Sequence, residues 1–347
     1  MKLQILKKLF PYTSDTSQIS GNVEILDGWR GIAIIFVLLS HFFPFLKAID
    51  LGRLGVDIFF VLSGLLMSNI LFLKRVPLGI FYKKRISRVF PVFFIYVSAV
   101  YLYGFAVLRS PETTNYLHTL FFLRSYIPIS PDILHTGLPI GHIWSLNIEE
   151  HCYVVLSIIS LFYVFKGREY IPLFCLGIAT FAAKLIYVQN ANSIEFNYDI
   201  RSEVVASFIF FSAGYFLIKS KLNAFVPSFM PIMTFALAAY CYSDDVPWYA
   251  KAFFPPILLA FTVNHLEKTP HFVQLLLTNP YLKKIGILSF SLYLWQQPFY
   301  FTFVKFGGYS PYIGFIVLPI AFLAGLVSFK YIEHPLRLWI NKHWAKV

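Results

Sequence analysis

An arginine and a histidine interrupt an apolar stretch near the N-terminus. In LDGWRGIAIIFVLLSHFFPF, residues 26–45, the ten residues between Arg30 and His41 are uncharged, and Ser40 is the one polar residue among them. Eleven residues of α-helix rise about 16 Å and turn about 20° past three full turns, so the two side chains share one face. The pair fits a polar pathway that uses the imidazole for proton transfer. It fits equally well a histidine bonded to a neighbouring helix and an ordinary basic anchor.

A carboxylate follows in GRLGVDIFFVLSG, residues 52–64. We expect Asp57 near the depth of His41 on the neighbouring helix. For Asp57 alone, the sequence favours a simpler role, a negative charge near a helix N-terminus that interacts well with the helix dipole. Gly55, Ser63 and Gly64 are small residues that allow helices to approach closely.

Two adjacent carboxylates lie in GHIWSLNIEEHCYVV, residues 141–155. His142 and Glu149 are two helical turns apart on one face, whereas Glu150 points about 100° away. Together with Trp144, these residues bring more polarity than a lipid-facing helix entry would carry. The stretch therefore predicts the lining of a cavity.

Two arginines, Arg85 and Arg88, lie three residues apart in FYKKRISRVFP, residues 81–91, and share a helical face. Guanidinium groups bind phosphate oxygens through paired hydrogen bonds. An alternative with equal support is a basic anchor at the lipid headgroups. We expect Pro91 in the first turn of the following span, where its missing N–H costs nothing.

Two amides precede a proline in SFSLYLWQQPFYF, residues 289–301. Pro298 should kink this helix. Gln296 and Gln297 beside Trp295 resemble the side chains of a sugar-binding site, in which aromatic faces stack on rings and amides bond hydroxyls. Hydrogen bonding between helices explains the glutamines at least as well.

The elements that must position these residues are apolar helices. The chain of 347 residues is 58% hydrophobic, 19% aromatic and 13% charged, with a mean hydropathy of +0.66. A globular chain is about one quarter charged, so we predict an all-α, polytopic integral membrane protein. The net charge of +12 is spread between the apolar runs and forms no basic domain that would bind nucleic acid. Ten runs are candidate spans, at about 30–47, 54–73, 89–108, 143–165, 170–188, 203–218, 225–242, 248–265, 285–304 and 312–332.

Basic residues predict the direction of these spans. With the N-terminus in the cytosol, 21 of the 29 Lys and Arg residues lie on the cytosolic side, 7 lie outside and Lys184 lies within a span. Both termini are then cytosolic. We expect residues 1–25 to form an interfacial segment, 26–337 the membrane domain and 338–347 a tail. Three cysteines in or beside apolar runs indicate neither a disulfide framework nor a metal site: Cys152, Cys175 and Cys241.

Taken in order, six motifs resemble the membrane acyltransferase family 3, which includes O-antigen and exopolysaccharide O-acetylases. They are LDGWRG with His41 eleven residues after Arg30, GVDIFFVLSG, RISR, HIWSLNIEE, SLYLWQQP and YIEHPLR, and they run from Leu26 to Arg337. The resemblance implies that residues 26–337 are an acyltransferase domain. It also implies transfer of an acyl group, usually acetyl from acetyl-CoA, to a hydroxyl of an extracytoplasmic carbohydrate.

The resemblance also implies roles for particular residues. Arg30 and His41 match the family's essential pair, Arg85 and Arg88 its arginine motif associated with the acyl donor, and Glu149 and Glu150 its paired carboxylates. Two departures stand out. The family often has Leu-Trp-His-Trp-Pro where this chain has Gln296 and Gln297, so no proton transfer is assigned there. Many relatives also carry a fused esterase-like domain, for which this chain has no room, and we therefore expect transfer in one step.

The working hypothesis is an O-acyltransferase of the bacterial inner membrane that crosses it several times. Arg30 holds a phosphate of cytosolic acetyl-CoA, and His41 is the general base, supported by Asp57 or Glu149. A transient acyl-histidine is a second route. We expect four residues to bind the carbohydrate or glycolipid acceptor: Trp144, Trp295, Gln296 and Gln297. The expected partners are acyl-CoA, this acceptor and membrane lipids, without a metal or nucleic acid.

Two other classes of function are compatible with the sequence. A carrier of an anion or acyl-sugar could use His41 as a proton relay, although the two halves of the chain show no repeat of the kind that carriers often have. A scaffold that organises glycan assembly would leave His41 and the glutamates without a task.

Overall fold

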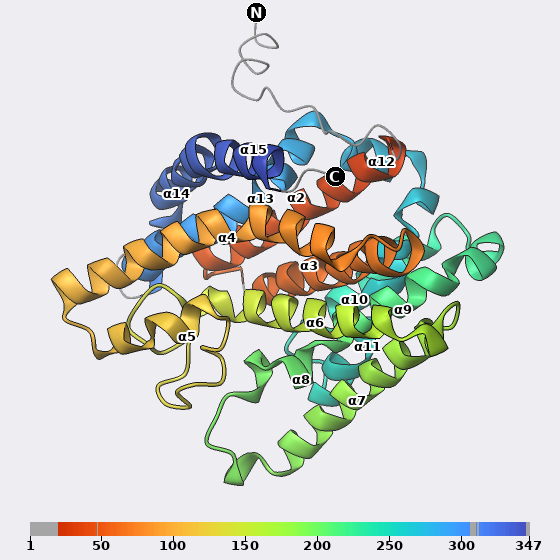
Figure 1. Ribbon diagram of the computed structural model, residues 1–347, viewed down its shortest axis with the longest axis horizontal. Helices are drawn as coiled ribbons and strands as arrows, with labels where there is room; N and C mark the ends of the chain where they lie inside the picture. Colours follow the sequence, from red (N-terminus) through yellow and green to blue (C-terminus); the bar gives the residue numbers. More distant parts are fainter. Residues whose placement is uncertain (1–19, 47, 306–309, 311, 345–347) are drawn as a thin grey trace, which may run out of the picture.

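The computed structural model describes residues 20–46, 48–305, 310 and 312–344, which form helices and no strand. The predicted all-α fold is thereby confirmed for these residues, whereas residues 1–19 of the predicted interfacial segment lie outside them. Short helices α5 (Tyr116–Leu120), α8 (Ser202–Val205), α12 (His271–Leu277) and α15 (His334–His343) accompany the longer ones (Figure 1). The longer helices are α2 (Ser20–Phe42), α3 (Leu51–Ser68), α4 (Leu78–Tyr103), α6 (Trp144–Leu161), α7 (Tyr170–Gln189), α9 (Ser207–Leu222), α10 (Met230–Tyr240), α11 (Trp248–Asn264), α13 (Pro280–Phe299) and α14 (Gly314–Ser328).

Each of the ten predicted apolar runs overlaps one of these longer helices. Within the described residues, five helical segments are long and apolar enough to cross a membrane: Glu24–Phe42, Leu51–Leu73, Leu78–Leu108, Tyr170–Gln189 and Gly314–His343. Several apolar helices of this length are typical of a membrane protein. The total of ten spans and the cytosolic position of the termini stay predictions.

The helix that carries the two arginines starts earlier than its hydropathy suggests. The apolar run begins near residue 89, but α4 begins at Leu78, so the prediction that Pro91 lies in the first helical turn is wrong. Lysine and arginine are good helix formers, and the basic segment therefore continues the helix beyond its apolar part. As a result Arg85 and Arg88 sit well inside α4 and face other helices.

Helices α2, α3 and α13 form the centre of the site, because α2 packs along both of the others. A Cβ on Gly286 of α13 would lie 1.8 Å from the Asp27 carbonyl oxygen of α2, and one on Gly55 of α3 would lie 2.6 Å from the Ala33 oxygen. Gly64 meets α9 in the same way, 2.3 Å from the Ile209 oxygen. The predicted close approach at Gly55 and Gly64 is confirmed. It brings the polar residues of α2 within reach of both neighbours.

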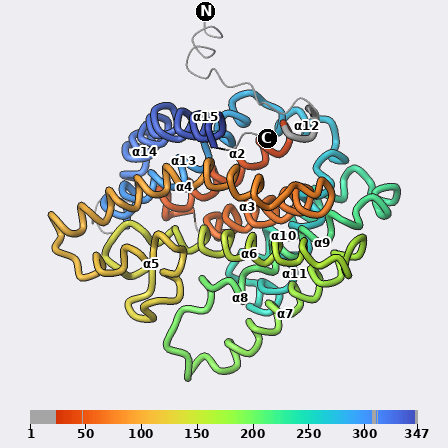
Figure 2. Tube along the Cα trace, viewed as in Figure 1, coloured from red at the N-terminus to blue at the C-terminus, as the bar shows by residue number. Residues whose placement is uncertain are grey.

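Figures 1 and 2 show where further helices lie relative to this centre. Helices α14 and α15 lie at one end of the molecule and α7 and α8 at the other, with α3, α4 and α6 between them (Figure 1, Figure 2). Between these ends, the carboxylates of α6 contact Arg85 of α4.

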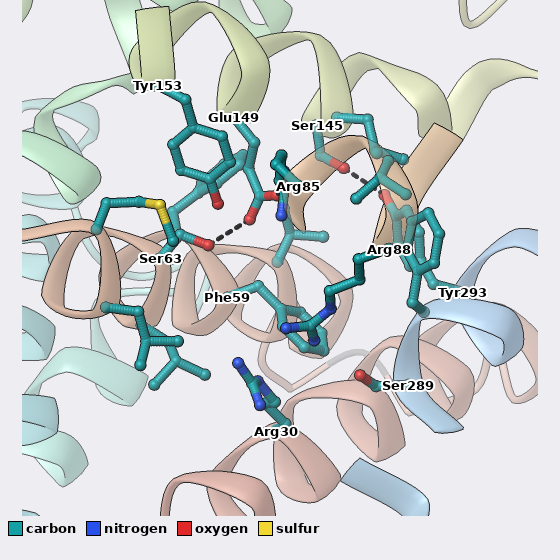
Figure 3. Close-up of a pocket in the computed structure, with 18 residues that line it drawn as sticks. Arg30, Phe59, Ser63, Arg85, Arg88, Ser145, Glu149, Tyr153, Ser289 and Tyr293 are labelled. Atoms are coloured by element: carbon teal, nitrogen blue, oxygen red, sulfur yellow. Dashed lines mark hydrogen bonds and ion pairs between the residues drawn. The ribbon is translucent and has the colours of Figure 1, made fainter. Parts of the chain in front are cut away.

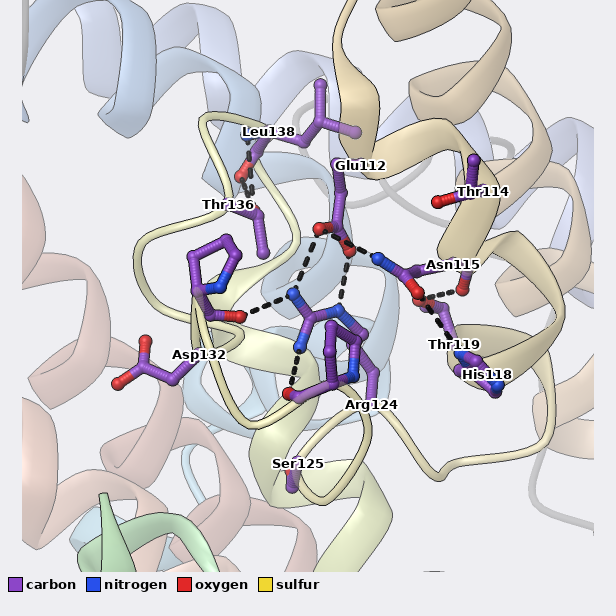
Figure 4. A network of polar contacts seen from close by, with 12 residues as sticks. Glu112, Thr114, Asn115, His118, Thr119, Arg124, Ser125, Asp132, Thr136 and Leu138 are labelled. Carbon is purple, nitrogen blue, oxygen red and sulfur yellow. Dashed lines mark hydrogen bonds and ion pairs between the residues drawn. The ribbon is translucent and has the colours of Figure 1, made fainter. Parts of the chain in front are cut away.

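The loop from α4 to α6 is held by a buried ion pair. Arg124 has no exposed surface, and its Nε and Nη2 donate to the two carboxylate oxygens of Glu112 at 2.5 and 2.9 Å. Its Nη1 and Nη2 also donate to the carbonyl oxygens of Pro128 and Pro131, at 3.3 and 2.8 Å (Figure 4). The run Leu117–Ile129 lies in this loop, as its length predicts. The network fixes the backbone that leads into α6.

Candidate active site

Three arginines from two helices line a cavity of about 110 Å³, which we call the arginine cavity. Arg30 comes from α2, and Arg85 and Arg88 come from α4; α3, α6 and α13 complete the walls. The side chains of Arg30 and Arg88 extend toward one another across it (Figure 3). Cations concentrated in a partly enclosed space attract anions such as phosphates.

The carboxylates of α6 hold one of these arginines. Arg85 donates from Nε to Glu150 at 2.8 Å and from Nη2 to Glu149 at 2.9 Å. Ser63 Oγ donates to Glu149 at 2.5 Å. Glu149 lines the arginine cavity, whereas Glu150 is not part of its lining. Both glutamates therefore act on the same guanidinium group, although they leave the helix in different directions.

Of the three arginines in this cavity, Arg88 has the least compensation for its positive charge. Arg30 donates to Asp27 at 2.8 Å, but Arg88 forms no ion pair with any residue that the structure describes. Arg30, Arg85 and Arg337 are close enough to repel its charge, and Glu333 is close enough to attract it. An anion in the arginine cavity would relieve this repulsion.

A second cavity, of about 310 Å³, lies next to the first and is lined by His41, His135 and His142. We call it the histidine cavity. Val56 of α3 and Tyr293 of α13 line both cavities, so these two side chains form part of the wall that the cavities share. Arg30 and His41 thus lie on one side of α2, as their spacing predicts, and each opens into one of two adjoining cavities.

A glutamine of α13 fixes the imidazole of His41. The His41 Nδ1 and Gln296 Oε1 atoms are 2.9 Å apart. Gln296 is fully buried, and its Nε2 faces two acceptors, the Tyr293 carbonyl oxygen at 3.4 Å and Gln297 Oε1 at 3.2 Å. With the amide nitrogen on these two acceptors, the amide oxygen faces His41, and because it can only accept, Nδ1 carries the proton. The predicted alternative of a hydrogen bond between helices is confirmed for this contact.

This tautomer leaves the lone pair of His41 on Nε2. That atom has no hydrogen-bond partner among the described residues, and His41 lines the histidine cavity. The ring stacks on Tyr300 with centroids 4.3 Å apart and planes 13° apart, which holds its orientation. The arrangement suits proton abstraction from a group in the cavity.

Neither carboxylate that the sequence offered as a support for His41 contacts it. Asp57 accepts from Arg53 Nε at 3.2 Å and from the Tyr242 hydroxyl at 2.7 Å, and Glu149 belongs to the arginine cavity. The residue that bonds to His41 is instead Gln296. The spacing of Arg53 and Asp57, four residues apart on one helix, is the signal that could have predicted this ion pair.

Comparison with known proteins shows the family to which this chain belongs. The sequence matches the family described as acyltransferase domain over residues 23–330. This chain belongs to the membrane acyltransferase family 3. Of the residues in the six motifs, Arg30, Arg85, Arg88 and Glu149 line the arginine cavity and His41 lines the histidine cavity.

The chain also resembles proteins of Staphylococcus aureus. SACOL0978 of strain COL is 26% identical over 90% of this chain. O-acetyltransferase OatA of strain NCTC 8325 is 25% identical over 90% of the chain. The chain spans 57% of the length of each of these relatives. No solved structure is a significant match.

Of the four residues predicted to bind the acceptor in this acyltransferase domain, two line the histidine cavity. These are Trp144, whose ring lies 5.0 Å below the Arg53 guanidinium, and Gln297. Trp295 lines neither cavity and packs edge-on against Tyr96, with centroids 5.4 Å apart. Gln296 lines neither cavity and bonds to His41 Nδ1. The sequence assigned no role to Tyr293, which lines both cavities, because a tyrosine in an apolar helix carries no distinctive spacing.

Proposed function

We propose that the protein transfers an acetyl group from acetyl-CoA to a hydroxyl of a carbohydrate, across a bacterial cell membrane. The observation that carries the proposal is that two unlike cavities share part of a wall, at Tyr293 and Val56. One offers guanidinium groups to a phosphorylated donor, and the other offers the Nε2 of His41 to a hydroxyl. The O-acetyltransferase name of the relative OatA supports the same reaction.

The donor binds with its phosphates in the arginine cavity. Arg88 and Arg30 contact them directly, since Arg85 already bonds to two glutamates. Guanidinium forks suit phosphate oxygens better than ammonium groups do. The thioester end of acetyl-CoA then extends past Tyr293 toward His41. With the cytosolic N-terminus that the basic residues predict, this donor enters from the cytosol and the acceptor from outside.

The acceptor hydroxyl loses its proton to His41 Nε2 as its oxygen attacks the thioester carbonyl carbon. The C–S bond breaks, the acetyl group stays on the acceptor oxygen, and the CoA sulfur leaves with the proton from His41. Gln296 Oε1 accepts from Nδ1–H throughout, and this bond strengthens when the ring becomes positively charged. One positioned base of this kind contributes typically about 10²–10⁴-fold to a rate.

The acceptor is a carbohydrate of the cell surface. Trp144, whose ring carries the Arg53 guanidinium over one face, and Gln297, with its amide, line the same cavity as His41. An aromatic face packs against the apolar side of a sugar ring, and an amide can donate to one hydroxyl and accept from another.

Deletion of the gene and mass analysis of surface glycans test this function. We expect each acetylated repeat unit of the glycan to be about 42 Da lighter in the deletion strain, which is the mass that one acetyl substituent adds. A plasmid copy of the gene should restore the mass. Membranes supplied with acetyl-CoA labelled in the acetyl group should form alkali-labile label on glycan. Label that crosses the membrane without becoming an ester would favour a carrier, and unchanged glycan masses would refute the proposal.

A further inference from the structure

A second histidine of the histidine cavity has no task in the proposed reaction. His142 lies in the short 3₁₀ turn Gly141–Ile143 that leads into α6, and 5% of it is exposed. Neither Nδ1 nor Nε2 has a hydrogen-bond partner among the residues that the structure describes. Buried polar side chains are rarely left unpaired, so an unpaired imidazole that lines a cavity calls for an explanation.

The surroundings of His142 hold the ring without using its nitrogen atoms. The rings of Tyr96 and Tyr293 contact it edge-on, with centroids 5.5 and 5.1 Å away. Their hydroxyls bond to backbone: Tyr96 donates to the Pro139 carbonyl oxygen at 2.5 Å, and Tyr293 donates to that of His142 at 2.8 Å. The imidazole is therefore enclosed by aromatic carbon, and both of its nitrogen atoms are buried and unpaired.

A neutral imidazole with two free nitrogen atoms has one donor and one acceptor. A sugar hydroxyl can bond to either nitrogen atom, since it can both donate and accept. His41 lines the same cavity and has its own Nε2 free. One polyhydroxylated molecule can therefore meet both imidazoles at once.

We propose that His142 binds the acceptor sugar, through a hydroxyl adjacent to the one that His41 deprotonates. This inference rests on the proposed function and assigns the acceptor a diol at the site of transfer. It makes His142 an acceptor-binding residue that fixes which hydroxyl approaches His41, and gives it no part in donor binding.

The test compares His142→Phe with His142→Gln in membranes that contain the cell's own glycan acceptor. Phenylalanine keeps the aromatic contacts with Tyr96 and Tyr293 but removes both nitrogen atoms. We expect the initial rate of label transfer from acetyl-CoA to glycan to fall about 10-fold or more in His142→Phe, the loss expected for a missing hydrogen bond. Glutamine, which can both donate and accept, should restore part of the rate.

Two further measurements separate acceptor binding from a structural or donor role. The stabilisation that acetyl-CoA gives the purified proteins against heat should be the same in His142→Phe and wild type. His151→Gln removes another imidazole of the same segment, one that bonds to Ser202 and lines neither cavity, and it should transfer at the wild-type rate.

Two results would overturn the inference. One is a wild-type rate in His142→Phe, and the other is loss of the acetyl-CoA stabilisation in that variant. If wild-type membranes place no acetyl label on glycan, the proposed function itself fails, and that outcome is seen before any variant is compared.

Discussion

Replacing Gln296 with leucine tests whether this residue fixes the proton on His41. Gln296→Leu removes the acceptor 2.9 Å from His41 Nδ1 and leaves the shape of the buried site nearly unchanged. A hydrogen bond to a charged group is worth about 1.5–3 kcal/mol. His41 is charged only after it has taken the proton. The same bond to the neutral ring is worth about 0.5–1.5 kcal/mol, so it is the difference of about 1–1.5 kcal/mol that falls on the transition state. This difference corresponds to about a 5- to 13-fold fall in kcat. The KM for acetyl-CoA should stay the same, because Gln296 does not line the arginine cavity.

The assay is the initial rate of acetyl transfer from labelled acetyl-CoA to glycan in membranes with equal amounts of each variant. Gln296→Glu keeps an acceptor opposite Nδ1 and should retain more activity than Gln296→Leu. Gln274→Leu is the matched control, since the Gln274 side chain donates to the backbone oxygens of Glu267 and Thr269, before α12, and lines neither cavity. A wild-type kcat in Gln296→Leu would refute the role assigned to this contact.

Three other predictions concern donor binding, stability and topology. Arg88→Lys should raise the apparent KM for acetyl-CoA about 10-fold because an ammonium cannot form a paired bond to phosphate. Arg75 pairs with Glu169 and lines neither cavity, so Arg75→Lys should leave this KM unchanged; an unchanged KM in Arg88→Lys would refute donor binding by Arg88. Arg124→Met leaves Glu112 buried without its cationic partner, so the free energy of unfolding in detergent should fall by about 3–5 kcal/mol. In the double variant Arg124→Met, Glu112→Met this free energy should fall less, and an equal or larger fall would contradict the pairing. Reporter fusions after Arg168 and Lys221 should report cytosol and a fusion near Asn192 the outside; the reverse pattern would place the arginine cavity on the wrong side for acetyl-CoA.

The helical fold was predictable because its signals are local. Runs of apolar residues predict each long helix, and small residues at Gly55 and Gly64 predict the close packing that the structure has. Hydropathy does not predict the boundary of a helix that continues beyond its apolar part. The basic segment before Pro91 is helical, and charge alone gave no sign of it.

The partners of the polar residues were harder to predict, because they depend on contacts between distant parts of the chain. Gln296 and His41 are 255 positions apart and meet only because α13 packs along α2. Without that contact, a carboxylate was the natural support for an imidazole, and Asp57 and Glu149 were the candidates. Both instead compensate arginines, since a buried carboxylate is stable only beside a cation or several donors.

The most direct test of the account is the activity of His41→Gln beside His41→Ala. Glutamine keeps hydrogen bonding and most of the volume of histidine, but it cannot take the proton from a hydroxyl. If His41 is the base, both variants should accumulate normally, keep their affinity for acetyl-CoA and transfer acetyl to glycan at below about 1% of the wild-type rate. Transfer near the wild-type rate in His41→Gln, at normal protein levels, would contradict the mechanism and leave His41 as a bond between two helices.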